Sequence, residues 1–454
     1  MSIHATVSRQ RAYFRSGATL PLRVRKRALN DLLREVTLRE GALLAALRQD
    51  LGKAAFEGYM TEIGLVKDEL RFHLKHLDQW AKDTPVSTPL VHFPSRSWTH
   101  PEPYGVALIM APWNYPVLLS LDPLIGALSA GNCAILKPSA YAPATSHALA
   151  ELIAAALPPE LVTVVEGGRE ENQALLEEQF DYIFFTGSPE VGRFVMEKAA
   201  RHLTPVTLEL GGKSPCIVTP SADLKVAARR IAFGKLVNAG QTCVAPDYIL
   251  VHERVKERLV TLIQREITHF LGDDPLDNPD FPKIVNQKHL DRLAGLLREG
   301  NLLCGGEIRD GRLSPTLVDG VDGNSPVMQE EIFGPILPVL TYRELDEVIQ
   351  FVQDRPKPLA LYLFTRSKQT EKTLLSRLSF GGGCVNDTIV HLASPKMPFG
   401  GVGGSGMGNY HGKASFDTFS HTKSILKKGN WLDIPVRYHP YTPAKEKLLR
   451  LLLK

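Results

Sequence analysis

The sequence has few cysteines and no concentration of charge of one sign. Its 454 residues include five cysteines and carry a formal net charge of only +4. Widely spaced cysteines of odd number suit reduced thiols in a reducing compartment better than a disulfide framework, so we expect a cytoplasmic location. Nucleic-acid binding requires clustered Lys and Arg, and the chain has no long cluster. We therefore expect no nucleic-acid partner.

The sequence also lacks a run of residues that would cross a membrane as a helix. The segment from Pro103 to Leu121 is uncharged, but three prolines and Asn114 interrupt it. The Leu-rich end, Lys445–Lys454, has ten residues, four of them Lys or Arg, and reaches about half of a membrane span. We expect no transmembrane segment. We expect this end to pack against the rest of the subunit or a partner subunit, with reversible membrane-surface binding as an alternative.

The pattern of apolar residues predicts two α/β domains and an arm. Up to residue 83 the apolar positions recur at the three-to-four spacing of helices. Prolines and alternating residues in 84–101 predict an extended arm or hairpin. From Gly105–Ala111 to Tyr182–Phe185 short apolar strands alternate with helical stretches, which is typical of a doubly wound parallel sheet. A second alternating region, from about Glu209 to Thr418, predicts a second such domain.

Three polar side chains lie next to turns where they could carry chemistry. Cys243 follows small, flexible residues that suit a turn presenting the thiol and its own N–H. Glu209 ends an apolar strand that meets a double glycine, and burial there would raise its pKa toward the range of a general base. Asn114 follows the Gly105–Ala111 strand at its carboxyl end, where ligands bind in open α/β sheets. Each also fits a structural role: an inert buried thiol, a helix-capping carboxylate and an asparagine in a turn.

The usual dinucleotide fingerprint G-x-G-x-x-G is missing, but one strand-to-helix turn has a related form. After Thr186 the chain reads Gly187-Ser188-Pro189-Glu190-Val191-Gly192. Pro189 suits the first position of a helix, and backbone N–H groups at a helix start can bind a pyrophosphate. Taken alone, the turn is more typical of an ordinary strand-to-helix connection.

The motifs together resemble those of the aldehyde dehydrogenase superfamily, over essentially the whole chain. Four motifs occur in that family in this order and spacing: Phe184–Gly192, Glu209–Pro215, Gly240–Cys243 and Glu331–Pro335. Three longer stretches are similar to its class 3 branch: His202–Pro215, Gly240–Leu250 and Pro398–His421. The resemblance implies a homodimer that oxidises medium- or long-chain aliphatic or aromatic aldehydes to carboxylic acids. It implies NAD or NADP as cofactor, with a cysteine thiohemiacetal and thioester as intermediates.

The resemblance assigns roles to individual residues. Cys243 matches the family's nucleophile, Glu209 its general base and Asn114 its oxyanion amide. The positions that match cofactor-binding residues are Lys137 on the ribose, Gly187, Ser188 and Gly192 on the pyrophosphate, Glu331 on the nicotinamide ribose and Phe333 beside the nicotinamide ring. We assign no metal-ligating residue. Tyr115, Leu119 and His411 are candidates to line the substrate pocket, and they suit aliphatic and aromatic aldehydes alike.

The predicted fold class is therefore α/β, with two doubly wound parallel-sheet domains and a small extended oligomerisation arm. The resemblance implies the following division: residues 1–83 and 102–208 form the NAD(P)-binding domain, 209–420 the catalytic domain, and 84–101 with 421–454 the oligomerisation arm and tail.

One position departs from the family pattern. Many relatives have an acid directly after the Lys-Pro-Ser of residues 137–139, where it binds the adenosine ribose hydroxyls, but this chain has Ala140. Without that carboxylate, repulsion of a 2′-phosphate is removed. We therefore predict that NADP is tolerated along with NAD.

Three other functions remain open at this point. An acylating dehydrogenase would pass the thioester to coenzyme A or phosphate, and Glu209 argues against it because such an enzyme needs no water-activating base. A thiol esterase without redox chemistry would leave Lys137, Glu331 and the Gly187 turn without a purpose. A non-catalytic binding protein with the same fold would need none of the three candidate catalytic side chains.

Overall fold

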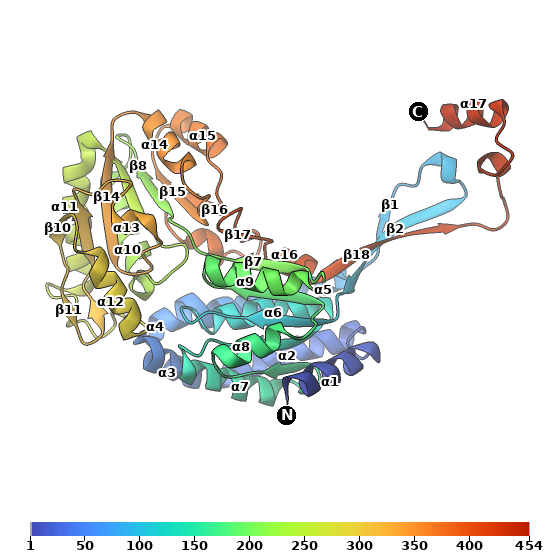
Figure 1. Cartoon of the computed structure of the whole chain (residues 1–454), viewed down its shortest axis with the longest axis horizontal. Coiled ribbons are helices and arrows are strands. Elements are labelled where there is room, and N and C mark those ends of the chain that lie inside the picture. Colours follow the sequence, from blue (N-terminus) through green and yellow to red (C-terminus); the bar gives the residue numbers. More distant parts are fainter. Residues whose placement is uncertain (1, 454) are drawn as a thin grey trace.

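The computed structural model describes residues 2–453 as two α/β bodies with a projecting arm (Figure 1). The first body is built on a six-stranded sheet of order β17-β7-β6-β3-β4-β5. Its strands are β3 (Val106–Met110), β4 (Cys133–Lys137), β5 (Val162–Val164), β6 (Tyr182–Thr186), β7 (Val206–Glu209) and β17 (Gly406–Met407). All neighbours run parallel except β17, which pairs antiparallel with β7. The predicted strands and their parallel arrangement are confirmed.

Helices cover this first sheet, as expected of a doubly wound fold. The helices that connect its strands are α6 (Leu118–Ala130), α7 (Pro143–Ala156), α8 (Arg169–Leu176) and α9 (Pro189–Ala200). The amino-terminal elements are α1 (Ile3–Arg15), α2 (Leu22–Leu38), α3 (Glu40–Leu51), α4 (Ala55–Gly58), the π-helix η1 (Tyr59–Ile63) and α5 (Gly64–Trp80). All residues of α6 are buried, because α2, α5 and α16 (Lys413–Thr418) all pack against it. This helix is therefore the centre of the first body.

The second body is built on a seven-stranded sheet of order β10-β13-β14-β9-β8-β15-β16. Its strands are β8 (Pro215–Val218), β9 (Tyr248–His252), β10 (Asn301–Cys304), β13 (Thr316–Asp319), β14 (Ile336–Tyr342), β15 (Ala360–Phe364) and β16 (Gly382–Val385). Only β10 runs antiparallel to its neighbour. The accompanying helices are α10 (Leu224–Leu236), α11 (Lys256–Leu271), α12 (Gln287–Leu296), α13 (Pro326–Gln329), α14 (Leu345–Gln353) and α15 (Lys368–Arg377). Short elements are η3 (Val237–Gly240), η4 (Glu253–Val255), η5 (Val390–Ala393) and the hairpin of β11 (Ile308–Arg309) and β12 (Arg312–Leu313). The second parallel-sheet domain is thus also confirmed as a fold.

The domain boundaries themselves remain a prediction. The sheet pairing shows only that β7 ends at Glu209 in the first sheet. It also shows that β17 returns from the later part of the chain to pair with β7.

The arm is a three-stranded antiparallel sheet that extends away from both bodies (Figure 1). Its strands are β1 (Thr84–Val86), β2 (Ser95–Pro103) and β18 (Ser420–Lys428), with η2 (Leu90–His92) in the connection between β1 and β2. β18 pairs with β2 along its whole length, from Ser420 opposite Pro103 to Lys428 opposite Ser95. The predicted extended arm is confirmed as a hairpin completed by a distant strand.

The end of the chain forms the helix α17 (Pro443–Leu452), preceded by η6 (Pro435–Arg437). None of its residues is buried, and its main contacts are with η6 and with η2 of the arm. Leu451 and Leu453 are 67% and 68% exposed. The main packing of this helix against its own subunit is therefore on the arm. Within residues 2–453 no helix is long and apolar enough to cross a membrane.

Asn132 joins the arm to the first body. It is fully buried in the turn before β4, where its Oδ1 accepts the N–H of Gly105 at 2.9 Å. Its amide donates to the carbonyls of Ala127 and Phe419 at 3.2 and 2.9 Å. One side chain thus connects the start of β3, the end of α6 and the residue before β18.

Replacing this amide should destabilise the whole chain. Asn132→Leu leaves buried backbone groups unpaired, so we expect the free energy of unfolding to fall by about 3 kcal/mol in urea denaturation. The matched control is Asn30→Leu on the exposed face of α2, where we expect a change within about 0.5 kcal/mol. Equal stability of Asn132→Leu and the wild type would contradict the role assigned to Asn132.

Candidate active site

Two turns, one from each body, meet at the predicted site. Asn114 lies in the turn that follows β3, and its amide donates to the carbonyl of Gln241 at 3.0 Å. Asn238, in the turn that follows α10, donates to the carbonyl of Asn114 at 2.8 Å. The hydroxyls of Tyr115 and Thr242 are 2.5 Å apart. These bonds bring the Asn114 turn against the residues that precede Cys243.

The turn that carries Cys243 is tightly constrained. Gly240 has φ +72°, and a Cβ there would lie 2.3 Å from the carbonyl oxygen of Gly334, so only glycine fits. Asn238 and Ala239 also have positive φ, 51° and 50°, which is uncommon for residues with a Cβ. Such backbone strain persists only where the surroundings impose it, and it clusters at functional sites. The expected sharp, small-residue turn is present.

Cys243 is partly buried, and its thiol is free. Burial raises the pKa of the thiol, and the carboxyl groups of Glu331 and Glu209 raise it further. The thiol therefore keeps its proton in this environment unless a base or a positive charge is brought near.

Glu209 lies at the end of β7 and is 3% exposed. Burial raises the pKa of its carboxyl well above the usual range. Within residues 2–453 neither of its oxygens has a hydrogen-bond partner, and the same holds for the hydroxyl of Thr186, its neighbour in register on β6. Buried polar groups without partners are rare and mark places that bind water or take part in chemistry. The expected burial of Glu209 is present.

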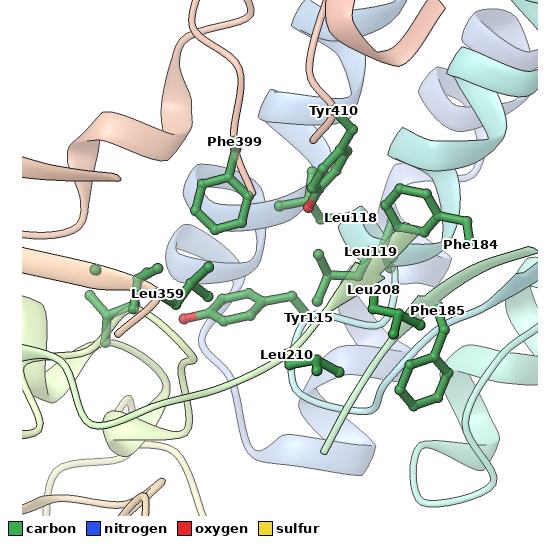
Figure 2. Close-up of a cluster of buried hydrophobic side chains, with 14 of the residues drawn as sticks. Tyr115, Leu118, Leu119, Phe184, Phe185, Leu208, Leu210, Leu359, Phe399 and Tyr410 are labelled. Carbon is green, nitrogen blue, oxygen red and sulfur yellow. The ribbon is translucent and has the colours of Figure 1, made fainter. Parts of the chain in front are cut away.

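Apolar side chains surround this region. Figure 2 shows Tyr115 and Leu119, from the turn before α6 and from α6 itself, close to Phe399 and Tyr410 of the later chain. His411 stacks on Phe399 with ring centres 5.5 Å apart, and its Nε2 is 3.2 Å from Asp122. Burial lowers the pKa of His411 to about 4, so this imidazole is neutral at pH 7. The surroundings of Tyr115 and Leu119 therefore suit an apolar substrate.

His411 also faces a different space. It lines an open pocket of about 640 Å³ together with Phe72, His76 and Trp80 of α5. Cys243, Glu209 and Asn114 are not among the residues that line this pocket. The pocket is therefore distinct from the turns that meet at Cys243.

The predicted pyrophosphate turn begins the helix α9. Ser188 is its N-cap, with Oγ accepting the N–H of Val191 at 3.4 Å, and Pro189 is the first helical residue. A Cβ at Gly192 would lie 2.7 Å from the side chain of Leu210, so glycine lets α9 approach the chain after β7. The helix start leaves backbone N–H groups and the positive end of the helix dipole for an anion.

Lys137 belongs to the first body and Glu331 to the second. Lys137 ends β4, and its Nζ donates to the carbonyls of Pro138 and Gly167, each at 2.7 Å. Burial lowers the pKa of this lysine. The carboxyl of Glu331 lies against the double glycine after β7, since a Cβ at Gly211 would be 1.8 Å from its Oε2. Burial raises the pKa of Glu331 to about 8.

Phe333 and Ala140 complete the predicted cofactor residues. Phe333 has φ 51°, and its ring is edge-on to Trp113 with centres 5.4 Å apart. Ala140 is exposed in the turn after β4, so a small side chain leaves the surrounding space free there.

Two lysines near Glu331 were not predicted. Lys213 forms an ion pair with Asp247 and donates to the carbonyls of Val327 and Glu330, which holds the loop that carries Glu331. Lys235 is buried, and burial lowers its pKa to about 8. Lys213 could have been found, because it lies inside the Glu209–Pro215 motif. Within residues 2–453 no group of three or more His, Cys, Asp or Glu side chains is placed to hold a metal ion.

Known proteins are similar to this chain over nearly its whole length. The model of the aldehyde dehydrogenase family matches residues 1–425. Aldehyde dehydrogenase family 3 member B2 of Mus musculus is 48% identical over 449 residues, 98% of this chain and 94% of the mouse protein. The substrate-bound structure of AldH from Staphylococcus aureus has a TM-score of 0.98 at 47% identity and covers 100% of both chains. An indole-3-acetaldehyde dehydrogenase in complex with NAD+ has a TM-score of 0.85 at 28% identity, over 93% of this chain and 88% of that chain.

The buried carboxyl of Glu209 should make stability depend on pH. In the unfolded chain a glutamate ionises near pH 4.3, roughly, whereas the folded chain keeps Glu209 neutral to higher pH. Its contribution to stability is therefore full below that pH and is lost as the pH rises toward the folded pKa. Glu209→Gln removes this loss, so its melting temperature should rise relative to that of the wild type as the pH increases above about 5.

The control for this measurement is Glu257→Gln, because the side chain of Glu257 is 90% exposed. Its melting temperature should follow that of the wild type at every pH. A difference between Glu209→Gln and the wild type that does not change with pH would show that Glu209 is ionised in the folded chain.

Proposed function

Because this chain belongs to the aldehyde dehydrogenase family, in its class 3 branch, we propose that Cys243, Glu209 and Asn114 oxidise aldehydes to carboxylic acids through a covalent thioester. The observation that carries the proposal is the hydrogen bond from the Asn114 amide to Gln241, which sets that amide beside the Cys243 turn. The product is the free acid.

The first step is attack of the Cys243 sulfur on the aldehyde carbonyl carbon. Its thiol needs a base because its pKa is raised, and the ionised form of Glu209 takes the proton. The carbonyl oxygen becomes an oxyanion of a thiohemiacetal. The second N–H of the Asn114 amide and the backbone N–H of Cys243 donate to it, in a site from which water is largely excluded.

The proposed cofactor is NAD or NADP, and the residues present fit it. The start of α9 at Gly187, Ser188 and Gly192 suits the pyrophosphate, Lys137 and Glu331 suit the two riboses, and Phe333 suits the nicotinamide ring. The carboxyl of Glu331 lies against the backbone after β7, and carboxyl oxygens can accept hydrogen bonds from ribose hydroxyls. When bound, the nicotinamide supplies the redox chemistry by accepting the hydride from the aldehyde carbon.

The second step is hydrolysis of the thioester. Glu209 first releases to solvent the proton that it took from Cys243, and its carboxylate then takes a proton from a water molecule, whose oxygen attacks the thioester carbonyl carbon. The bond between carbon and sulfur breaks, the sulfur regains a proton, and the carboxylic acid leaves. The unpartnered oxygens of Glu209 and hydroxyl of Thr186 support this role, because together they offer two groups that can hold a water.

The substrate class and the assembly complete the proposal. The apolar side chains around Tyr115 and Leu119 favour medium- or long-chain aliphatic and aromatic aldehydes. The projecting arm and the exposed leucines of α17 support a homodimer, because such apolar surface is usually covered. All five cysteines are free, which supports the cytoplasm as the location.

Replacing the nucleophile and the base should have different kinetic effects. Cys243→Ala should form no NADH. Glu209→Gln loses the base of both steps, so its first NADH should form more slowly than in the wild type, and hydrolysis should slow most: NADH should approach one per site and turnover should then be about 100- to 10,000-fold slower. Stopped-flow fluorescence of NADH measures both, with Cys304→Ala as the matched control that keeps wild-type rates.

The same assay distinguishes the proposed enzyme from an acylating dehydrogenase. Free acid should form without coenzyme A or phosphate. Dehydrogenase activity retained in full by Cys243→Ala, or acid release that requires coenzyme A, would contradict the proposed mechanism.

The absence of an acid at position 140 should be visible in cofactor preference. We expect kcat/KM with NADP to exceed about a thousandth of the value with NAD, a gap of less than about 4 kcal/mol. Ala140→Glu should lower kcat/KM for NADP and spare NAD, whereas the uncharged Ala140→Gln, of the same size, should lower NADP use much less. An NADP efficiency below that thousandth in the wild type would refute the argument.

A further inference from the structure

An ion pair lies completely inside the first body. Lys53, between α3 and α4, and Glu62, in η1, are both 0% exposed, with Nζ and Oε1 2.6 Å apart. No other ion pair between the residues that the structure describes has both side chains fully buried. Removing two charges from water is unfavourable, and replacing a buried ion pair by apolar residues of similar volume often leaves a protein equally stable or more stable. The pair therefore needs an explanation other than stability.

Apart from the bond between them, the hydrogen bonds of the two side chains all go to the turn between β3 and α6. The Nζ of Lys53 donates to the carbonyl of Asn114 at 3.2 Å and lies 4.2 Å from the ring centre of Tyr115. The second carboxylate oxygen of Glu62 accepts the N–H of Val117 at 2.8 Å and of Leu118 at 3.2 Å. Lys53 thus holds the start of the turn that follows β3, and Glu62 holds its end at the beginning of α6.

The backbone around Glu62 is also unusual. The segment Tyr59–Ile63 is a π-helix placed between the α-helices α4 and α5. π-turns inside helices are rare and frequently occur at functional sites. This observation is independent of the charges, and it marks the same residue.

We propose that Lys53 and Glu62 are a positioning pair that sets the Asn114 amide at the correct place for the oxyanion on Cys243. The inference rests on the proposed function, in which that amide stabilises the oxyanion. The carbonyl that Lys53 binds and the amide that donates to Gln241 belong to the same residue. A shift of the turn therefore moves the donor, and a misplacement of about 1 Å can slow an enzyme by about 100-fold.

The test uses a variant without either charge in the full-length enzyme. Lys53→Met/Glu62→Met removes both charges of the pair together, so it should unfold at a higher temperature than either single variant, in which one charge of the pair stays buried without its partner. With rates calculated per mole of folded enzyme, we expect its kcat to fall by about tenfold or more, with a smaller change in KM. Lys256→Met/Asp319→Leu is the matched control, because that pair, 2.6 Å apart, lies in the second body. It should keep wild-type kcat.

A double-mutant cycle separates positioning from general loosening. In an Asn114→Ala background the loss of the pair should lower kcat by less than about twofold, because the donor that the pair positions is already gone. Wild-type kcat in Lys53→Met/Glu62→Met, or an equal loss in both backgrounds, would overturn the inference. Wild-type kcat in Asn114→Ala alone would instead refute the role of Asn114 in the proposed function, and the pair's role with it.

Discussion

The hydrogen bonds between the Asn114 turn and the Cys243 turn are the contacts on which the site depends. Each turn belongs to a different α/β body, and neither body alone contains a complete set of candidate groups. The amide of Asn114 donates to Gln241, and Asn238 donates back to the carbonyl of Asn114. Because both bonds run between backbone carbonyls and buried side chains, they fix distance and direction together. These bonds therefore hold the two bodies in a fixed relative position at the point where a covalent intermediate would form.

Burial sets the electrostatics of this point. The thiol of Cys243 and the carboxyls of Glu209 and Glu331 all have raised pKa values, chiefly because the charged forms lose their water. Neutral forms are thus favoured in the resting protein, and like charges do not accumulate around the sulfur. The same low polarity strengthens each hydrogen bond that forms to a developing oxyanion. Lys213 and Lys235 add positive charge on the Glu331 side.

The sequence predicted most of the fold because the parallel strands are buried on both faces and therefore appear as continuous apolar runs, such as Val106–Met110 and Cys133–Lys137. It predicted the candidate site residues because they sit in long motifs. Lys53 and Glu62 could not be predicted, because a lysine and a glutamate in a stretch with helical periodicity are typical of a solvated surface. Their burial follows from tertiary packing. The partner strand of the arm, β18, was also hidden, because its pairing with β2 joins segments more than 300 residues apart.

The complete burial of the helix α6 limits how its sequence can change in evolution. Every one of its residues is buried, from Leu118 to Ala130, and its first turn is bound by Glu62 while its end is bound by Asn132. No position on it faces water, so no substitution there is neutral with respect to packing. In α17, where no residue is buried, almost any polar exchange leaves the subunit intact. Sequence change should therefore be slower in this buried helix than at the carboxyl end, and a slowly changing residue in this protein need not be one that reacts.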